Sequence, residues 1–250
     1  AAPATPETPL ALPPARPRTL VIAPGPHLHA AESTASIMWW VNGALAPLVS
    51  EVEVIVVNDG SADGSGPLLD TLAAERPWLT VVHHPHNGGY GKALISGFTA
   101  ARHDWVFYTD GDAQYDAREA AVLVPMATHD VDIVQGYKIG RGDSWYRKAI
   151  GRTYHHVVRT LFRLHVRDTD CDFRLFRRRL FTDRPLASTS GVICVEMMFR
   201  FERAGARFVE APVHHYFRPH GKSQFFRLPA IGRSAKQLVS LWWRLVVRGE

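Results

Sequence analysis

Residues 52–61 read Val-Glu-Val-Ile-Val-Val-Asn-Asp-Gly-Ser, a β-branched run that ends in a cluster of turn formers. A strand that is apolar at nearly every position is typical of a strand buried on both faces of a sheet. Asn, Asp, Gly and Ser favour turns, so the chain is expected to leave the strand at Asn58. A buried strand with an acidic turn at its carboxyl end predicts an α/β sheet that binds ligands beyond its strand ends.

Short strands and helices alternate on both sides of this stretch. The predicted strands are 19–23, 79–83, 105–109 and 131–135, and the predicted helices are 33–49, 65–76, 91–102, 144–164, 195–204 and 225–248. This alternation implies right-handed crossovers and a mostly parallel sheet flanked by helices. The turns at Asp59 and Asp110 both follow strands, so they are expected to meet in one crevice.

The composition suits one large α/β domain, because 46% of the 250 residues are hydrophobic. The formal net charge of +5 favours polyanionic partners such as nucleotide diphosphates, nucleic acid or an anionic membrane, and a solvated basic surface explains it equally well. Cys171 and Cys194 form no CxxC and no zinc-type spacing. They are expected to be buried, reduced thiols of a cytosolic protein, which excludes a disulfide framework and a structural zinc site.

The Pro- and Ala-rich residues 1–18 are predicted to be a disordered leader, because they lack the charged start and apolar core of a signal peptide. No uninterrupted apolar run reaches the roughly 18–20 residues that cross a bilayer. The chain is therefore expected to be soluble or peripheral to a membrane.

Asp110-Gly-Asp112-Ala-Gln114 follows the predicted strand 105–109. Its two carboxylates and one amide oxygen, at alternate positions, suit a hard cation such as Mg²⁺ or Mn²⁺ that keeps places for substrate phosphate oxygens. An ordinary acidic turn is the alternative. The position at a strand end, with a second acidic turn at Asp59, favours the metal site.

Two further turns suit a nucleotide. Asp59 could accept hydrogen bonds from a base or ribose, and Gly60 would allow a close approach of the ligand, although turn chemistry explains both equally well. The loop 87–91 is rich in glycine and leads to Lys92 at the start of a helix, a combination that suits phosphate. Its spacing is not that of a Walker A motif.

Five segments in this order resemble the inverting family 2 glycosyltransferases of GT-A fold, and above all the polyprenol-phosphate glycosyltransferases of the dolichol-phosphate mannose synthase type. The segments are VIVVNDGSADGS, HNGGYGKALISGF, FYTDGDAQYD, VRDTDCDFRLFRR and HYFRPHGKSQ, which together span roughly residues 52–224. The resemblance implies transfer of a hexosyl unit from a GDP- or UDP-sugar to a polyprenyl phosphate, with Mg²⁺ or Mn²⁺.

The resemblance also implies roles for individual residues. The donor would be bound by Asp59, Gly60, Lys92, Asp110, Gly111 and Asp112, with Asp59 at the nucleoside. The metal would be held by Asp110, Asp112 and Gln114. Donor or acceptor phosphate would be met by Arg174, Arg218, Lys222 and Ser223. Asp112 and Asp172 would be catalytic.

The role of Asp172 depends on the acceptor. A phosphate monoester is largely ionised at pH 7, because its second pKa is about 6, and it needs positioning more than a base. Asp172 could then simply pair with Arg174 or Arg177. A hydroxyl acceptor would need a base, and Asp172 or Asp170 could supply it.

The sequence departs from the family at residues 23–29. The family usually has a Pro-Ala-Tyr-Asn-Glu-like segment there that helps to hold the nucleotide, whereas this chain reads Ala-Pro-Gly-Pro-His-Leu-His. An altered loop is expected at this nucleoside end, and His27 and His29 as metal ligands are the alternative.

The chain is expected to divide into the leader 1–18, a glycosyltransferase domain 19–224 and a C-terminal helix 225–250. Within the domain, 19–135 would bind the donor and 136–224 the acceptor. The basic, amphipathic stretches 138–163 and 225–248 predict peripheral contact with the cytoplasmic face of the membrane. Packing onto the domain is the alternative for both, and 225–248 could also be a stub that leads to spanning segments.

Three other functions stay open from the residues alone. The chain could be a soluble transferase that acts on a saccharide or natural-product hydroxyl, or a degenerate, non-catalytic relative. A nucleic-acid binder is disfavoured, because no nucleic-acid motif appears and nucleic acid would not explain an acidic metal cluster in the expected crevice.

Overall fold

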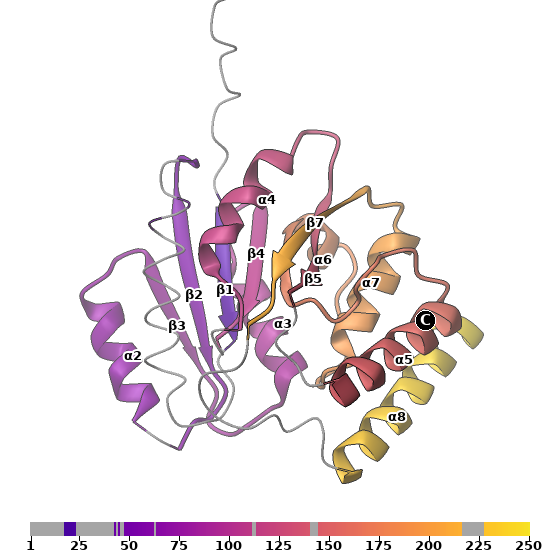
Figure 1. Cartoon of the computed structure of the whole chain (residues 1–250). Helices are drawn as coiled ribbons and strands as arrows, with labels where there is room; N and C mark the ends of the chain where they lie inside the picture. The colour runs from indigo at the N-terminus through magenta and orange to yellow at the C-terminus, as the bar shows by residue number, and fades with distance from the viewer. Residues whose placement is uncertain are drawn as a thin grey trace, which may run out of the picture.

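The structure, a computed structural model, describes residues 18–23, 43, 45, 48–62, 64–111, 114–140, 145–216 and 228–250. Figure 1 shows one central sheet with helices packed on both sides. The strands are β1 (Arg18–Ala23), β2 (Val52–Asn58), β3 (Leu79–His83), β4 (Trp105–Asp110), β5 (Ile133–Ile139), β6 (Phe173–Arg177) and β7 (Phe208–His214).

The seven strands lie in the order β3-β2-β1-β4-β6-β5-β7. β1 pairs in parallel with β2 and β4, β2 pairs in parallel with β3, and β5 pairs in parallel with β7. β6 is antiparallel to both β4 and β5. The prediction of a mostly parallel sheet is therefore confirmed, with β6 as the strand that makes it mixed.

The described helices are α2 (Ser65–Ala74), α3 (Tyr90–Ala100), η1 (Ala117–Glu119), α4 (Ala120–Met126), α5 (Trp145–Phe162), α6 (Arg179–Thr182), α7 (Ile193–Arg203), α8 (Leu228–Trp242) and the π-helical turn η2 (Trp243–Val247). Figure 1 places α5 and α8 side by side at the lower right, and Trp242 Nε1 donates a hydrogen bond to the Leu161 carbonyl at 3.1 Å. The two long helices of the chain's second half, α5 and α8, therefore pack on each other.

Two hydrophobic cores lie on opposite faces of the sheet, because successive side chains of a strand point to opposite sides. On β2, Ile55 and Val57 join a core with α3, α5, α7 and α8. Val54 and Val56 join the other core, with α2 and α4. β2 is buried at every residue but its first, so the prediction of a strand buried on both faces is confirmed.

Five described elements were missed by the sequence pattern: the strands β6 and β7, the helix α4, and the short helices η1 and α6. α4 follows the acidic turn and contains Pro125, and β6 and β7 fall in segments whose arginine, glutamate, proline and histidine residues obscure any apolar run. β5 begins and ends later than its predicted range 131–135. The two missed strands take their structure from pairing and burial within the sheet, a tertiary effect that outweighs local propensity.

Two predictions fall mostly outside the described residues, namely the leader 1–18 and the helix 33–49. Cys171 and Cys194 are free and buried, as predicted. Within the described ranges, no helix is both long enough and apolar enough to cross a bilayer.

Candidate active site

The strand order brings the two acidic turns together. β1 lies between β2 and β4, and its last residue, Ala23, is paired with Asp110. Asp59 directly follows the end of β2 on the other side of β1. β6 begins where β4 ends, since Phe173 is paired with Thr109. Asp172, which precedes Phe173, therefore lies at the same edge of the sheet as Asp110 and Asp59.

Asp110 ends β4 and is held by Tyr90 from the first turn of α3. Tyr90 Oη donates a hydrogen bond to Asp110 Oδ1 at 2.9 Å. Burial raises the pKa of Tyr90 well above its usual value, and the charges of Asp110 and Asp172 raise it further. The Tyr90 hydroxyl therefore keeps its proton and lies close to both carboxylates, with Gly111 buried in the turn that follows.

Gln114 is fixed by the chain that leaves β7. Its Nε2 donates to the Tyr216 carbonyl at 3.1 Å, and Tyr216 N donates back to the Gln114 carbonyl at 2.8 Å. Two hydrogen bonds therefore tie Gln114 to the segment after β7. Its predicted role as an oxygen ligand stays a prediction.

Asp59 is bound on both of its oxygens by its own chain. Oδ1 accepts from Gly88 N at 2.8 Å and lies 2.6 Å from His84 Nδ1, and Oδ2 accepts from Gly89 N at 2.9 Å. The carboxylate is only 4% exposed. The contact that the structure describes is therefore with the glycine-rich loop, and the predicted contact with a nucleoside stays a prediction.

The glycine-rich loop is also held from its other side. Gly91 N donates to the Thr189 carbonyl at 2.9 Å. Together with the bonds from Gly88 and Gly89 to Asp59, three of the N–H groups that could cradle a phosphate already have partners inside the chain. Lys92, in the first turn of α3, is exposed and remains the predicted phosphate contact of this loop.

Gly60 packs closely against another loop of the same chain, at His86 and Asn87. Its φ is +70°, and an added Cβ would lie 2.6 Å from the backbone of His86 and Asn87. The left-handed conformation and the close packing both require glycine. The described close approach is thus between two loops of the chain, while an approach of the donor to Gly60 stays a prediction.

The segment before β6 is held by two polar side chains of β5, Gln135 and Lys138. Gln135, which is 0% exposed, donates from Nε2 to the carbonyls of Asp168 and Cys171 at 3.2 and 3.3 Å. Lys138 Nζ donates to the Asp170 carbonyl. These hydrogen bonds from β5 therefore define the backbone course of the acidic segment.

Arg174 is part of the same support. Its Nε donates to the Cys171 carbonyl at 3.1 Å, its Nη2 donates to the Thr169 carbonyl at 3.2 Å, and its side chain is 0% exposed. Its guanidinium lies 5.1 Å from the ring centre of Tyr108. Arg174 thus orders the acidic segment in this structure, and its predicted meeting with a phosphate stays a prediction. No ion pair joins Asp172 to Arg174 or Arg177 among the described residues.

Asp170 and Asp172 present two carboxyl groups at this edge. Burial raises the pKa of Asp170 to about 7, against the opposing effect of Lys138. Asp172 Oδ1 lies 3.2 Å from both Tyr108 Oη and Cys194 Sγ. This edge of the sheet therefore holds one carboxyl that takes up a proton near neutrality and one that is held by two donors.

Several predicted site residues lie outside the described residues. These are His27, His29, Asp112, Arg218, Lys222 and Ser223. Conversely, no pattern in the sequence pointed to Tyr108 and Cys194, since a tyrosine within a strand and a cysteine within a helix are ordinary core residues. Tyr90 stands in the glycine-rich loop, but its bond to Asp110 depends on the packing of α3 beside β4.

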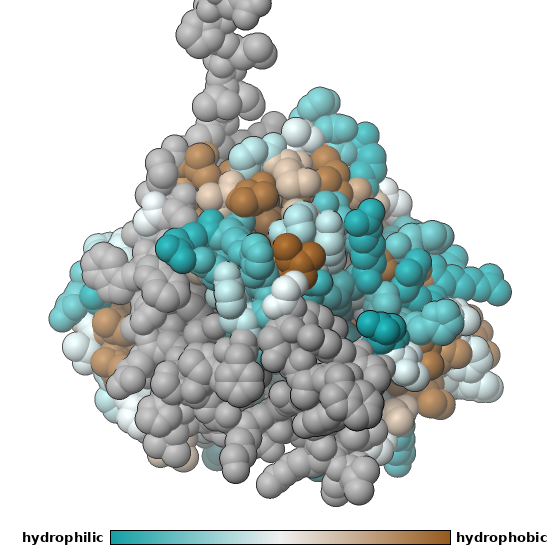
Figure 2. All heavy atoms as spheres, viewed as in Figure 1, coloured by the Kyte–Doolittle hydropathy of each residue, from teal (hydrophilic) through white to brown (hydrophobic). Residues whose placement is uncertain are grey.

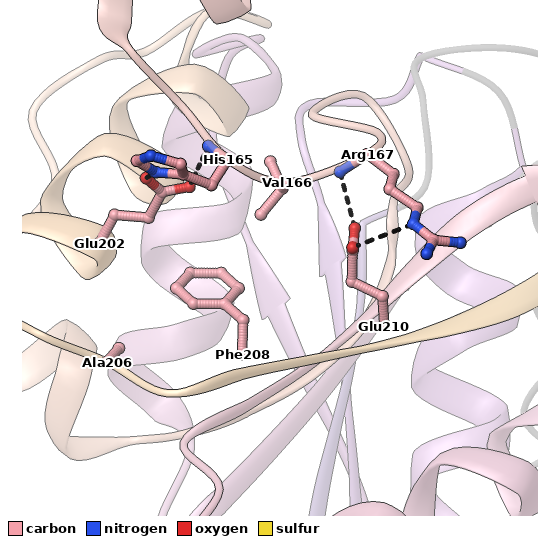
Figure 3. Close-up of a pocket in the computed structure, with 7 residues that line it drawn as sticks. All are labelled: His165, Val166, Arg167, Glu202, Ala206, Phe208 and Glu210. Atoms are coloured by element: carbon pink, nitrogen blue, oxygen red, sulfur yellow. Dashed lines mark hydrogen bonds and ion pairs between the residues drawn. The ribbon is translucent and has the colours of Figure 1, made fainter.

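A separate cavity of about 530 Å³ lies at the start of β7, the end of the sheet opposite to Asp110. Figure 3 shows its two carboxylates turned toward the segment 165–167. Glu202 accepts from His165 N at 2.9 Å, and Glu210 accepts from Arg167 N at 2.7 Å. These carboxylates hold the segment 165–167 against α7 and β7. The charged residues that line this cavity therefore have a structural role.

Residues 42–184 match the profile of the family described as Glycosyl transferase family 2. Among curated proteins, the undecaprenyl-phosphate 4-deoxy-4-formamido-L-arabinose transferase of Aeromonas hydrophila is 30% identical over 194 residues, which cover 77% of this chain and 59% of that protein. Glycosyltransferase AglD of Haloferax volcanii is 31% identical over 208 residues, which cover 78% of this chain and 32% of AglD. The chain thus spans less than two thirds of these relatives.

Two solved structures have a similar fold. Glucosyl-3-phosphoglycerate synthase from Mycobacterium tuberculosis, in complex with Mn²⁺, UDP and phosphoglyceric acid, has a TM-score of 0.69 at 18% identity and covers 92% of this chain and 78% of its own. Mannosyltransferase PcManGT from Pyrobaculum calidifontis, in complex with GDP-Man and Mn²⁺, has a TM-score of 0.65 at 20% identity. The match covers 97% of this chain and 68% of PcManGT. The expected GT-A fold is confirmed.

Proposed function

The chain belongs to glycosyl transferase family 2, and from this membership we propose that it transfers one sugar unit from a nucleotide-sugar to a polyprenyl phosphate. The named acceptor of the Aeromonas relative, undecaprenyl phosphate, supports this acceptor class. The donor would be a GDP- or UDP-sugar of the hexosyl type. The two solved structures of similar fold, crystallised with UDP and with GDP-Man, support a nucleoside diphosphate at this kind of site.

One observation carries the proposal: the strand order gathers Asp59, Asp110 and Asp172 at a single edge of the sheet. Asp59 and Asp110 flank the end of β1, where an open α/β sheet binds its ligand. Asp172 enters from β6, on the side that leads to the second half of the chain. The donor would therefore lie over 19–135, and the acceptor would approach over 136–224.

A divalent cation fits the residues at the end of β4. Carboxylate and amide oxygens are the ligands that Mg²⁺ and Mn²⁺ prefer, and Asp110, Asp112 and Gln114 would provide them. Tyr90, which donates to Asp110 Oδ1, would orient the first of these ligands. When bound, the metal would neutralise the charge that builds up on the diphosphate as the sugar leaves.

We also infer that α5 and α8 face a membrane. Exposed apolar side chains recur at helical spacing, at Ile150, Val157 and Leu161 on α5 and at Val239, Trp243 and Val247 on α8 and η2. Figure 2 shows hydrophobic patches among hydrophilic ones on the side where Figure 1 draws these two helices.

The charges of these helices have one sign. Residues 145–162 and 228–247 contain no Asp or Glu, and they carry Arg152, Arg159, Arg233, Lys236 and Arg244. Basic helices with an apolar stripe bind anionic lipid, as on the cytoplasmic leaflet. Such contact would bring the crevice to a lipid-linked phosphate.

The proposed function is tested by nucleoside diphosphate release. The protein is incubated with UDP-, GDP- and dTDP-sugars, MnCl₂ and undecaprenyl phosphate in detergent. We expect release with one donor that depends on both the metal and the lipid phosphate. No release with any donor, together with no binding of UDP or GDP by calorimetry, would sink the proposal. Release unchanged in Asp112→Ala would sink the metal assignment alone.

Membrane contact is tested by sedimentation with phosphatidylglycerol vesicles. Val239→Glu and Trp243→Glu are expected to weaken binding at least tenfold, because each places an acid in the apolar stripe. Val122→Glu is the matched control, since Val122 is 53% exposed and lies on α4. Equal loss in all three variants, or no binding by the parent chain, would contradict the proposed membrane face.

A second candidate function has support from Asp172. A fixed carboxylate at the acceptor side suits a hydroxyl acceptor, which must lose a proton as it attacks. The same assay with soluble saccharides in place of the lipid distinguishes the two. Release with a saccharide and none with undecaprenyl phosphate would make the soluble transferase the correct choice.

A further inference from the structure

Two buried side chains converge on one oxygen of Asp172. Tyr108 Oη and Cys194 Sγ each donate to Asp172 Oδ1 at 3.2 Å. Tyr108 belongs to the central strand β4, and Cys194 belongs to the first turn of α7. They are 0% and 4% exposed. Two rigid elements that are far apart in sequence therefore hold this carboxyl group.

Both groups donate to Asp172. Burial raises the pKa of the Cys194 thiol well above its ordinary value, so the thiol keeps its proton at neutral pH. Tyr108 Oη is placed as the second donor by its 3.2 Å contact with the same carboxyl oxygen. A thiol is a weak donor toward a neutral partner, and its bond is stronger when the acceptor is a carboxylate.

The backbone of Asp172 is fixed as well. Asp172 N donates to Tyr115 Oη at 3.3 Å, and the preceding Cys171 carbonyl accepts from Arg174 Nη2 at 2.6 Å. Among the described residues, Asp172 Oδ2 receives no hydrogen bond. One carboxyl oxygen is thus tied to the core, and the other belongs to a half-buried side chain at the crevice edge.

We infer that Cys194 and Tyr108 are positioning residues that hold Asp172 Oδ1 so that Oδ2 faces the attacking oxygen of the acceptor. This inference rests on the proposed function. As the acceptor oxygen bonds to the anomeric carbon, the bond from that carbon to the donor diphosphate breaks, and its electron pair leaves with the diphosphate. Oδ2 takes the proton when the attacking group is a hydroxyl or a protonated phosphate.

The kinetic test uses a matched pair of variants. Cys194→Ala removes the donor, and Cys194→Ser keeps a donor of similar size. We expect Cys194→Ala to lower kcat about tenfold with the donor KM unchanged, and Cys194→Ser to restore most of the loss. A purely structural role would make the buried serine at least as harmful as the alanine, and that result would overturn the inference.

A double-mutant cycle shows whether Cys194 acts through Asp172. In an Asp172→Asn background, Cys194→Ala should lower kcat no further, because the carboxylate that it positions is already gone. An equal tenfold loss in both backgrounds would overturn the inference. Tyr108→Phe, measured in the same cycle, is expected to behave like Cys194→Ala.

A spectroscopic test separates this inference from the proposed function. The infrared S–H stretching band of Cys194 is assigned by its absence in Cys194→Ala. We expect Asp172→Asn to move this band to higher frequency, because the hydrogen bond to a carboxylate is lost. A band that does not move overturns the inference, whereas a shifted band in a protein without transferase activity upholds the contact and sinks the proposed function alone.

Discussion

The carboxylate of Asp59 accepts a hydrogen bond from the backbone N–H of Gly89 at 2.9 Å, and thereby ties the turn after β2 to the loop before α3. The other oxygen accepts from Gly88 N at 2.8 Å. A buried carboxylate that satisfies two backbone donors stabilises both loops at once. Asp59, which is predicted from the sequence to contact the nucleoside, thus also holds the glycine-rich loop in place.

Asp59→Asn should therefore loosen the donor side of the crevice. The amide can accept from only one of the two N–H groups, so the free energy of unfolding is expected to fall by about 2 kcal/mol. Affinity for UDP or GDP, measured by calorimetry, should fall at least tenfold. Asp70→Asn is the control, because Asp70 is 65% exposed and pairs with His83 at the surface. A change of similar size in both variants would contradict this role of Asp59.

Glycine is required where the loop meets residues 188–190. A Cβ on Gly89, whose φ is +93°, would lie 2.5 Å from the Thr189 carbonyl, and a Cβ on Gly91 would overlap the Ser188 carbonyl. Each alanine variant is expected to cost about 1–3 kcal/mol of stability by overpacking. Gly64→Ala, which meets nothing within 4 Å, should leave the melting temperature unchanged. Melting curves of the three variants check this, and equal melting temperatures would contradict it.

Tyr90→Phe should weaken the metal site without altering the fold. The variant keeps the ring and loses only the hydroxyl that donates to Asp110 Oδ1 at 2.9 Å. Groups that orient a metal ligand typically contribute 10–100-fold to metal affinity. We expect the Mn²⁺ concentration for half-maximal nucleotide release to rise at least tenfold. Tyr137→Phe, on β5, serves as the control. A Mn²⁺ dependence like that of the parent chain would show that Tyr90 does not act on the metal.

Asp170 should make the stability of the protein depend on pH. Burial raises its pKa to about 7, whereas an unfolded chain releases the proton near pH 4. Between these values the folded state binds the extra proton, so stability falls as pH rises from 4 to 7. Three charged groups act on the same carboxyl group. Lys138 lowers the pKa of Asp170, whereas Asp168 and Asp172 raise it.

The variant Asp170→Asn removes this pH dependence. Relative to the parent chain it should gain stability as pH rises from 5 to 8, by on the order of 2–4 kcal/mol. Urea unfolding at the two pH values measures the difference. A difference that is the same at pH 5 and pH 8 would show that Asp170 ionises like an exposed carboxyl group.

Local patterns were sufficient for the parallel strands on the donor side of the fold. The β-branched run 52–57, the strand 79–83 and the strand that ends at Asp110 were all found, because each is a short apolar run closed by turn formers. β6 and β7 were not, since Arg174, Arg177 and Glu210 are buried or partly buried only in the context of the sheet. Arg174 is the clearest case: an arginine in a strand suggests exposure, and its buried position depends on the carbonyls of Thr169 and Cys171.

The sequence by itself determined the chemistry available to this protein: the acidic turns after β2 and β4, the acidic segment before β6 and the basic helices. These follow from residue type and from periodicity along the chain. Only the tertiary structure decided which groups act on one another. The bonds of Tyr90 to Asp110 and of Cys194 to Asp172 join residues 20 and 22 positions apart. Such contacts arise from the order in which strands pair and helices pack, which no local pattern records.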